Sequence, residues 1–338
     1  MHGIDNARVI DCHAHVRIEV DMGPQWQHGP EYGADDQGQP WYRVGNYRLQ
    51  GVKHTRSPFT DAQLRIEAMD AAGIDFQVLS PSPLTYFHFI DPSQAIAYCR
   101  KWNDALAKLC ARHGDRLAGL ATLPMQDSAG AAAELSRAVN ELGLIGGAIG
   151  TDFGRSMESR DLDVLYEAAC EEDVPLFVHG VPAGIDGPAG DPNLRHFDLD
   201  VVCGFSAQVT IAVATLIYGG VMRRHPELKI CVSDGGGATP FLAGRMRQAA
   251  LKRPWSPDWL REPGAFEHYL GMLWFDTNVG DARSLDLLVE VAGTEHLVMG
   301  TNFAGWDQQD SIKKGADLPM LADNARRLLA SRRRGQPC

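Results

Sequence analysis

Short apolar runs alternate with helical segments along almost the whole chain, and this alternation constrains the fold more than any other feature. Eight runs have the length and character of buried strands: 9–15, 76–80, 117–123, 145–150, 176–179, 229–233, 273–278 and 297–301. Segments with apolar residues at helical spacing separate them, for example 61–72, 92–113 and 131–142. Such alternation predicts a parallel sheet, and eight repeats predict a closed (β/α)8 TIM barrel.

Composition limits the remaining possibilities. A chain of 338 residues with 44% hydrophobic content can bury one large core, so we expect a single domain over 1–338. The net charge of −11 makes nucleic acid an improbable partner. The seven cysteines are scattered without a CxxC spacing, which predicts neither disulfides nor a thiolate zinc site and favours a reducing compartment. We find no signal peptide and expect no membrane span, so the predicted location is cytoplasmic, with a homodimer as one possible assembly.

Two histidines at the end of the first run indicate a metal site. His13 and His15 are two residues apart on the expected strand, so their imidazoles point to the same side. His179 closes the fifth run immediately before a glycine. The carboxyl ends of barrel strands meet at one face, where TIM barrels keep their active sites. Three convergent imidazoles are typical of a zinc, iron or copper site.

Two segments interrupt the repeat and should lie over the barrel mouth. The first is a loop insertion at about 20–53, which is rich in glycine, proline and aromatic residues, and the second runs from 181 to 200. Trp26 and Trp41 in the first loop are candidate substrate-binding residues, because aromatic side chains near strand ends can wall an apolar cavity. Tyr42, Tyr86 and Phe87 could contribute to the same wall.

Several motifs, in one order, resemble the amidohydrolase-related decarboxylase family typified by aminocarboxymuconate semialdehyde decarboxylase. They are the opening VIDCHAH, the segments AMD, GID and QVLS at 68–80, LATLPMQ at 120–126, VHG at 178–180, GGG at 235–237 and DNARRL at 323–328. The resemblance implies a TIM barrel that binds one divalent metal through His13, His15, His179 and an eighth-strand Asp. It also implies a catalytic His on the sixth strand and a substrate-carboxylate contact at the position of Arg245.

The chain departs from this family at two functional positions. Asp234 stands where the family has its catalytic His, and Asn302 stands where the family has its metal-binding Asp. Three interpretations remain open: an inactive barrel, a zinc-dependent hydrolase or decarboxylase whose base has moved, for instance to Asp276, and a rebuilt metal centre. In the rebuilt centre Asp234 would join the three histidines, and further carboxylates would hold a second metal; the candidates are Glu19, Asp276, Glu67 and Asp307.

We favour the rebuilt centre, because three histidines with added carboxylates on this barrel resemble the nonheme diiron monooxygenases of platensimycin and platencin biosynthesis. That resemblance implies two iron ions, dioxygen, an electron donor and hydroxylation of an unactivated C–H bond in a bulky diterpenoid acyl-CoA. The expected metal ligands are His13, His15, His179, Asp234, Glu19 and Asp276, and the expected catalytic residues are Asp234, Asn302 and Asp276. Basic residues that could meet a CoA phosphate are Lys313, Lys314 and 332–334.

Overall fold

Eight parallel strands form a closed barrel, as the sequence predicts. The computed structural model describes residues 2–51, 55–182, 191–303, 305, 308 and 320–330. The barrel strands are β1 (Ile10–Val16), β5 (Phe76–Pro81), β6 (Leu117–Gly119) continued by β7 (Ala121–Thr122), β8 (Gly147–Gly150), β9 (Leu176–His179), β10 (Ile230–Val232), β11 (Trp274–Asp276) and β12 (Leu297–Val298). Each falls within or next to one of the eight predicted runs, which confirms the predicted fold class.

Parallel pairing runs from β1 to β5 and β6, and from β7 through β8, β9, β10 and β11 to β12. Backbone hydrogen bonds between the two ends of this order close the ring. The amide of Cys12 donates to the carbonyl of Met299 at 2.8 Å, and the amide of Phe303 donates to the carbonyl of His13 at 3.2 Å. The first strand is therefore fixed against the segment that follows the last strand, and residues from opposite ends of the chain meet at the barrel mouth.

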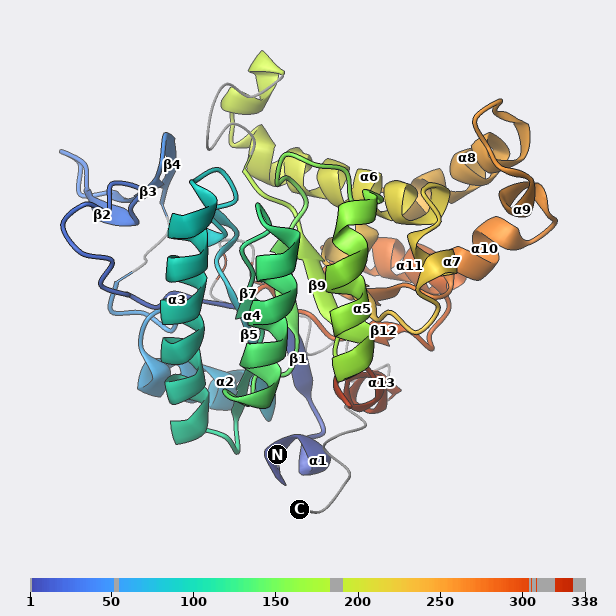
Figure 1. The fold of residues 1–338 in the computed structure, drawn as a ribbon. Helices are drawn as coiled ribbons and strands as arrows, with labels where there is room; N and C mark the ends of the chain where they lie inside the picture. The colour runs from blue at the N-terminus through green and yellow to red at the C-terminus, as the bar shows by residue number, and fades with distance from the viewer. Residues whose placement is uncertain are drawn as a thin grey trace.

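Helices surround the barrel (Figure 1), with α3, α4 and α5 side by side on one flank. The helices of the first half are α1 (His2–Asn6), α2 (Ala62–Ala72), α3 (Pro92–Arg112), α4 (Ser128–Asn140) and α5 (Asp163–Glu172). Those of the second half are α6 (Phe205–Tyr218), α7 (Val221–Arg224), α8 (Thr239–Lys252), α9 (Asp258–Arg261), α10 (Ala265–Leu270), α11 (Ala282–Ala292) and α13 (Met320–Leu329). Short helical turns are η1 (Pro83–Thr85), η2 (Arg160–Leu162), η3 (Pro192–Arg195), η4 (Asp200–Gly204) and η5 (Asp234–Gly236).

Local sequence signals account for where the helices begin. Asp61 caps α2 by accepting hydrogen bonds from the amides of Gln63 and Leu64, and Asp91 caps α3 through the amide of Ser93. Proline at the first position of α3 leaves no amide unsatisfied there. These caps place both helices within a residue of the predicted segments.

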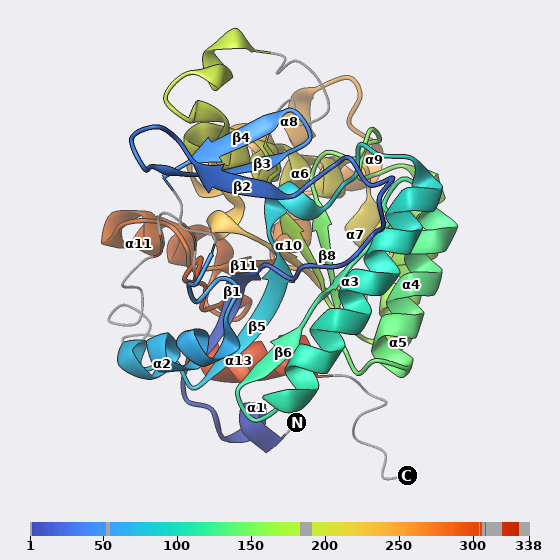
Figure 2. The same ribbon diagram turned by 90° about the vertical axis from the view of Figure 1, so that its left-hand side faces the viewer.

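The insertion after β1 is a small sheet, and the prediction of a loop there was wrong. Strands β2 (Glu31–Ala34), β3 (Pro40–Val44) and β4 (Tyr47–Gln50) pair antiparallel. The sheet forms because alternate residues face inward: Tyr42, Val44 and Tyr47 are buried, whereas their neighbours on β3 and β4 are more exposed. Figure 2 shows this sheet at the end of the molecule opposite α1.

The segment that precedes and includes α6 is unusually apolar. Residues Asp200–Tyr218 are long and apolar enough to cross a membrane by length and composition alone. In the fold this segment is one of the helices of the barrel. Val209, Val213 and Leu216 are fully buried in the hydrophobic core, and this packing against the barrel accounts for the apolar character of one face of α6.

Candidate metal centre

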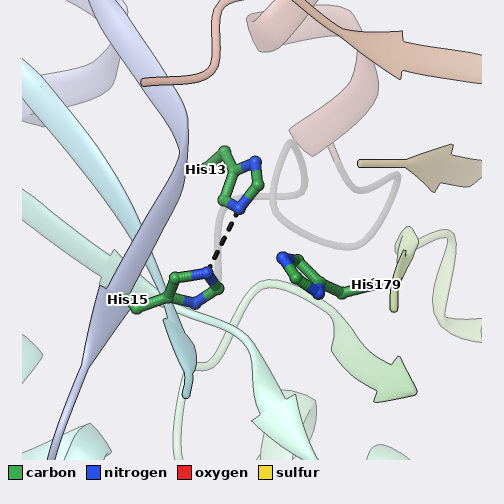
Figure 3. Close-up of side chains that lie close together, drawn as sticks. All are labelled: His13, His15 and His179. Carbon is green, nitrogen blue, oxygen red and sulfur yellow. Dashed lines mark hydrogen bonds between the residues drawn. The ribbon is translucent and has the colours of Figure 1, made fainter. Parts of the chain in front are cut away.

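Three histidines from two barrel strands converge at the mouth (Figure 3). His13 and His15 come from β1, His179 comes from the end of β9, and all three are buried. Their ring centroids lie 5.0 to 5.1 Å apart, and one ring nitrogen from each lies within 4.8 Å of the other two. The two positions predicted from β1 and the one predicted from β9 are therefore brought to one point.

The second nitrogen of each ring has its own partner. His13 Nδ1 lies 2.7 Å from Asp276 Oδ2, and His15 Nδ1 lies 3.1 Å from both the Pro81 carbonyl and Ser80 Oγ. His179 Nδ1 lies 2.6 Å from the Gly180 carbonyl. Because these partners accept hydrogen bonds, each Nδ1 carries a proton, and each Nε2 is turned toward the common centre. Orientation of metal-binding imidazoles by this kind of outer partner is usual in proteins.

The charges differ among the three rings. Burial alone would lower the pKa of His13, but the charge and hydrogen bond of Asp276 outweigh it and raise that pKa to about 9. Burial and the nearby His13 lower the pKa of His15 well below its ordinary value, and burial also lowers the pKa of His179. Protonated His13 can therefore donate from Nε2 to His15 Nε2, which lies 3.2 Å away. A divalent cation would take the place of that proton, so the three imidazoles fit a metal ion.

Asp276 orients His13 and does not belong to the three-histidine cluster. Its Oδ2 holds His13, while its Oδ1 accepts hydrogen bonds from the amides of Gly235 (3.2 Å) and Asn278 (3.1 Å). The close approach of the strands depends on Gly300, because a Cβ there would lie 2.9 Å from the Cβ atoms of both His13 and Asp276. Both oxygens of Asp276 are therefore engaged, and the carboxylate would influence a metal ion through His13.

A second polar group lies beside the histidines. Asp234 begins η5 with a positive φ of 54° and is half-buried. Its Oδ1 accepts a hydrogen bond from Asn278 Nδ2 at 2.9 Å, and its Oδ2 accepts one from Ser233 Oγ at 3.0 Å. Asn302 also has a positive φ, 50°, and its carbonyl closes a turn with the amide of Gly305. Both positions that depart from the family pattern therefore face the same site as the histidines, although neither belongs to the three-histidine cluster.

These residues form the floor of a cavity of about 380 Å³. Its polar lining includes His15, His179, Asp234, Asn278, Asn302, Ser82, Ser206 and Ser284. Its apolar walls include Leu49, Phe59, Leu84, Val201, Phe205, Phe241, Val279 and Leu287. Tyr47 and Leu49 come from the small sheet, so the insertion does reach the site as the sequence analysis expects. Among the described residues that line this cavity, there is no Lys or Arg.

Asn278 is the residue at this site that the sequence analysis missed. It is buried and lines the cavity; its Nδ2 donates a hydrogen bond to Asp234 Oδ1, and its backbone amide donates one to Asp276 Oδ1. Its position two residues after Asp276, at the end of the seventh run, was the available signal, because every strand end of a TIM barrel faces the same mouth.

Two predicted carboxylate ligands lie elsewhere. The side chain of Glu19 is 66% exposed and is held by Arg17 Nη2 at 2.7 Å and by the hydroxyl of Tyr32. Glu67 lies on α2, where it accepts a hydrogen bond from Gln63 Nε2 at 3.0 Å. The structure therefore corrects the placement of both carboxylates beside a second metal. Asp307, like Lys313, Lys314 and 332–334, lies outside the described residues.

The predicted substrate-binding residues also lie away from the main cavity. Trp26 packs against Phe87 and stacks on Tyr98, and Trp41 lies under Arg48. Arg245 is exposed on α8. None of Trp26, Trp41 and Arg245 lines the main cavity, because the tryptophans are used in packing the insertion and Arg245 is turned to solvent.

Several known proteins similar to this chain are decarboxylases, and another is a 2-keto-4-carboxy-3-hexenedioate hydratase of Sphingobium that is 26% identical over 88% of this chain and 83% of its own. The 2-amino-3-carboxymuconate-6-semialdehyde decarboxylase of Dictyostelium discoideum is 30% identical over 244 residues, which are 72% of this chain and 66% of that protein. A gamma-resorcylate decarboxylase of Rhizobium radiobacter is 28% identical over 78% of this chain and 85% of its own. The crystal structure of 5-carboxyvanillate decarboxylase from Novosphingobium aromaticivorans, complexed with manganese and 4-hydroxy-3-methoxy-5-nitrobenzoic acid, has a TM-score of 0.69, 25% identity and coverage of 81% and 79%.

These similarities overturn the diiron monooxygenase interpretation. These relatives are decarboxylases and a hydratase, so neither an oxidoreductase nor a role in antibiotic biosynthesis is supported. The physical reason lies in the carboxylates: Asp276 is engaged by His13 and the backbone, and Glu19 is exposed and paired. Within the described part of the chain, the one cluster suited to a metal is formed by His13, His15 and His179. The changes at Asp234 and Asn302 therefore do not indicate a second metal, and the three histidines could hold one ion.

A family model supports the same assignment along nearly the whole chain. The amidohydrolase model matches residues 10–330, which include every barrel strand and all three histidines. The chain therefore belongs to the amidohydrolase family.

Proposed function

We propose that this protein is a metal-dependent decarboxylase of a small carboxylic acid. The observation that carries the proposal is the buried convergence of three imidazole Nε2 atoms beside an otherwise largely apolar cavity. The decarboxylase activity of the relatives gives the reaction class.

His13, His15 and His179 would hold one divalent ion, zinc or manganese. Such an ion polarises a carboxylate or an adjacent oxygen as a Lewis acid. Asp276 holds His13 in the tautomer that turns Nε2 to the centre, and the carbonyls of Pro81 and Gly180 do the same for His15 and His179. The chain thus supplies neutral ligands whose orientation is fixed before any substrate enters.

The cavity favours an acid with one carboxylate and an apolar, unsaturated body. A divalent ion on three neutral imidazoles could bind one substrate carboxylate, but the carboxylates of Asp276 and Asp234 already offset its two charges, so a second substrate carboxylate would add uncompensated negative charge. No cationic side chain is present among the described lining residues to meet a second carboxylate. Phe59, Leu84 and Phe205 offer apolar surface to the rest of the molecule.

Asp234 is our candidate for the proton carrier. Decarboxylation breaks the bond between the carboxyl carbon and its neighbour, releases CO2 and leaves an electron pair on the neighbouring carbon, which must take a proton. Besides the metal-binding histidines, the titratable side chains of the described lining are Asp234 and Tyr47. Tyr47 is buried and hydrogen-bonded to Asp200, whereas Asp234 is half-buried beside the histidines. Asn278 and Ser233 hold the Asp234 carboxylate in position.

The test is an anaerobic assay of the manganese- or zinc-loaded enzyme with a panel of phenolic monocarboxylic acids, 2,6-dihydroxybenzoate among them, and with enoic dicarboxylic acids. We expect CO2 release from a monocarboxylic acid, loss of activity with loss of metal in His179→Ala, and loss of activity with metal retained in Asp234→Asn. Release of CO2 by a His179→Ala variant that binds no metal would refute the proposal.

A further inference from the structure

A second cavity lies beside the main one and has no part in the proposed reaction. Its volume is about 120 Å³, and Pro83 and Leu84 line both cavities, so these two residues form the wall between them. The segment that follows β5 and the segment that follows β8 provide most of its surface. Cavities of roughly 150 Å³ hold a benzene ring, and a single water needs only about a tenth of that volume.

A buried histidine in this cavity has one unused nitrogen. His88 is 9% exposed, and its Nδ1 lies 3.2 Å from the carbonyl of Asp152, to which it donates. Its Nε2 is buried and has no hydrogen-bond partner among the residues that the structure describes. Burial lowers the pKa of His88 to about 4, so the ring is neutral at pH 7. Since the proton is on Nδ1, the Nε2 is an acceptor that needs a donor, and the described residues supply none.

The rest of the cavity is apolar and aromatic. Tyr86 stacks on the His88 ring with centroids 5.2 Å apart, and Phe153 meets it edge-on at 5.9 Å. Phe87, Phe89 and Val181 complete the apolar surface. Leaving a buried acceptor unpaired is costly, and aromatic walls favour a flat apolar body. The complementary ligand has one hydroxyl donor on a ring of about six carbons.

We propose that the cavity around His88 is a second small-molecule site that binds a phenol. His88 Nε2 accepts a hydrogen bond from the phenol's hydroxyl group. The ring of the phenol lies against Phe87 and Phe153. None of the three histidines lines this cavity, so the proposal does not depend on the proposed decarboxylase activity.

The test is a titration of the full-length zinc-loaded protein, with its histidines labelled with ¹⁵N, using phenol and anisole. The two ligands share the ring, but anisole has no donor. We expect saturable phenol binding in roughly the millimolar range, a shift of the His88 Nε2 signal toward its protonated position, and anisole binding about five- to tenfold weaker. The His88→Phe variant should bind phenol more weakly than the wild type by the same factor of about five to ten.

His296 provides the matched control, because its Nδ1 also pairs with a backbone carbonyl, that of Gly271, but it lines no described cavity. The His296→Phe variant should bind phenol as the wild type does. Equal affinities for phenol and anisole would overturn the proposal, and so would phenol binding with no change at His88. An absence of saturable binding would show that the cavity holds water only and would also overturn it. Because the phenol and anisole comparison uses the wild type, it decides the matter even if His88→Phe fails to fold.

Discussion

Binding of a metal ion should release one proton from His13 near neutral pH. Asp276 raises the pKa of His13 to about 9 in the metal-free protein, so at pH 7 the ring carries a proton on Nε2, the atom that faces the metal position. The pKa values of His15 and His179 are lowered, so those rings contribute no proton. The apparent affinity should therefore rise about tenfold per unit just above pH 7, by about 50-fold or roughly 2.3 kcal/mol in all from pH 7 to pH 9, and level off at higher pH.

Calorimetry can count the released protons. Anaerobic titration with Mn²⁺ in two buffers of different ionisation enthalpy should give about one proton per ion at pH 7 and about half a proton at pH 9. The Asp276→Asn variant is the comparison, because it removes the charge that raises the His13 pKa while keeping the side chain's size; its proton release at pH 7 should fall toward zero. If the wild type released no proton at pH 7, or released two, the assignment of charge within the cluster would be refuted.

Four substitutions test other parts of the site. Asp276→Asn should also weaken metal binding by about 10- to 100-fold above pH 9, where protons no longer compete with the metal. In either orientation of the new side-chain amide, its NH2 group would face a hydrogen-bond donor, either His13 Nδ1 or the amide of Gly235. Competition with a chelator measures the affinity. Asp234→Asn should lower kcat by about 10²- to 10⁴-fold with full metal content, and metal loss in this variant would instead make Asp234 a ligand. Gly300→Ala should cost about 1–3 kcal/mol in thermal or denaturant unfolding, because its Cβ has no room. Gly244→Ala, on the exposed side of α8 with no atom within 4 Å, should instead stabilise by roughly 0.5–1 kcal/mol; an equal loss in both variants would refute the packing argument.

The fold and the three histidines were predictable because their signals are local. Each barrel strand is a short apolar run. His13 and His15 both lie on β1, two residues apart, so their side chains point to the same side of the strand. His179 ends a strand, and strand ends meet at one face of a TIM barrel. No long-range contact had to be known to place these three side chains together.

The parts that were missed depend on partners far apart in the sequence. Asp276 looked like a ligand, but it holds His13, which is 263 residues away. Glu19 follows His15 closely, yet Arg17 and Tyr32 hold it at the surface. The small sheet did have a local signal: alternate buried residues flank the turn at 45–46 between β3 and β4. The reaction itself could not be inferred from the departures at Asp234 and Asn302, because a changed residue does not specify what replaces its chemistry.

The most direct test of the account is the fate of a ¹³C-labelled carboxyl group when the manganese-loaded enzyme turns over its acid in D2O with air present. The account predicts one ¹³CO2 for each molecule consumed, one deuterium at the carbon that lost the carboxyl group, and no uptake of dioxygen. Retention of the ¹³C label in a product that has gained an oxygen atom from dioxygen would contradict it.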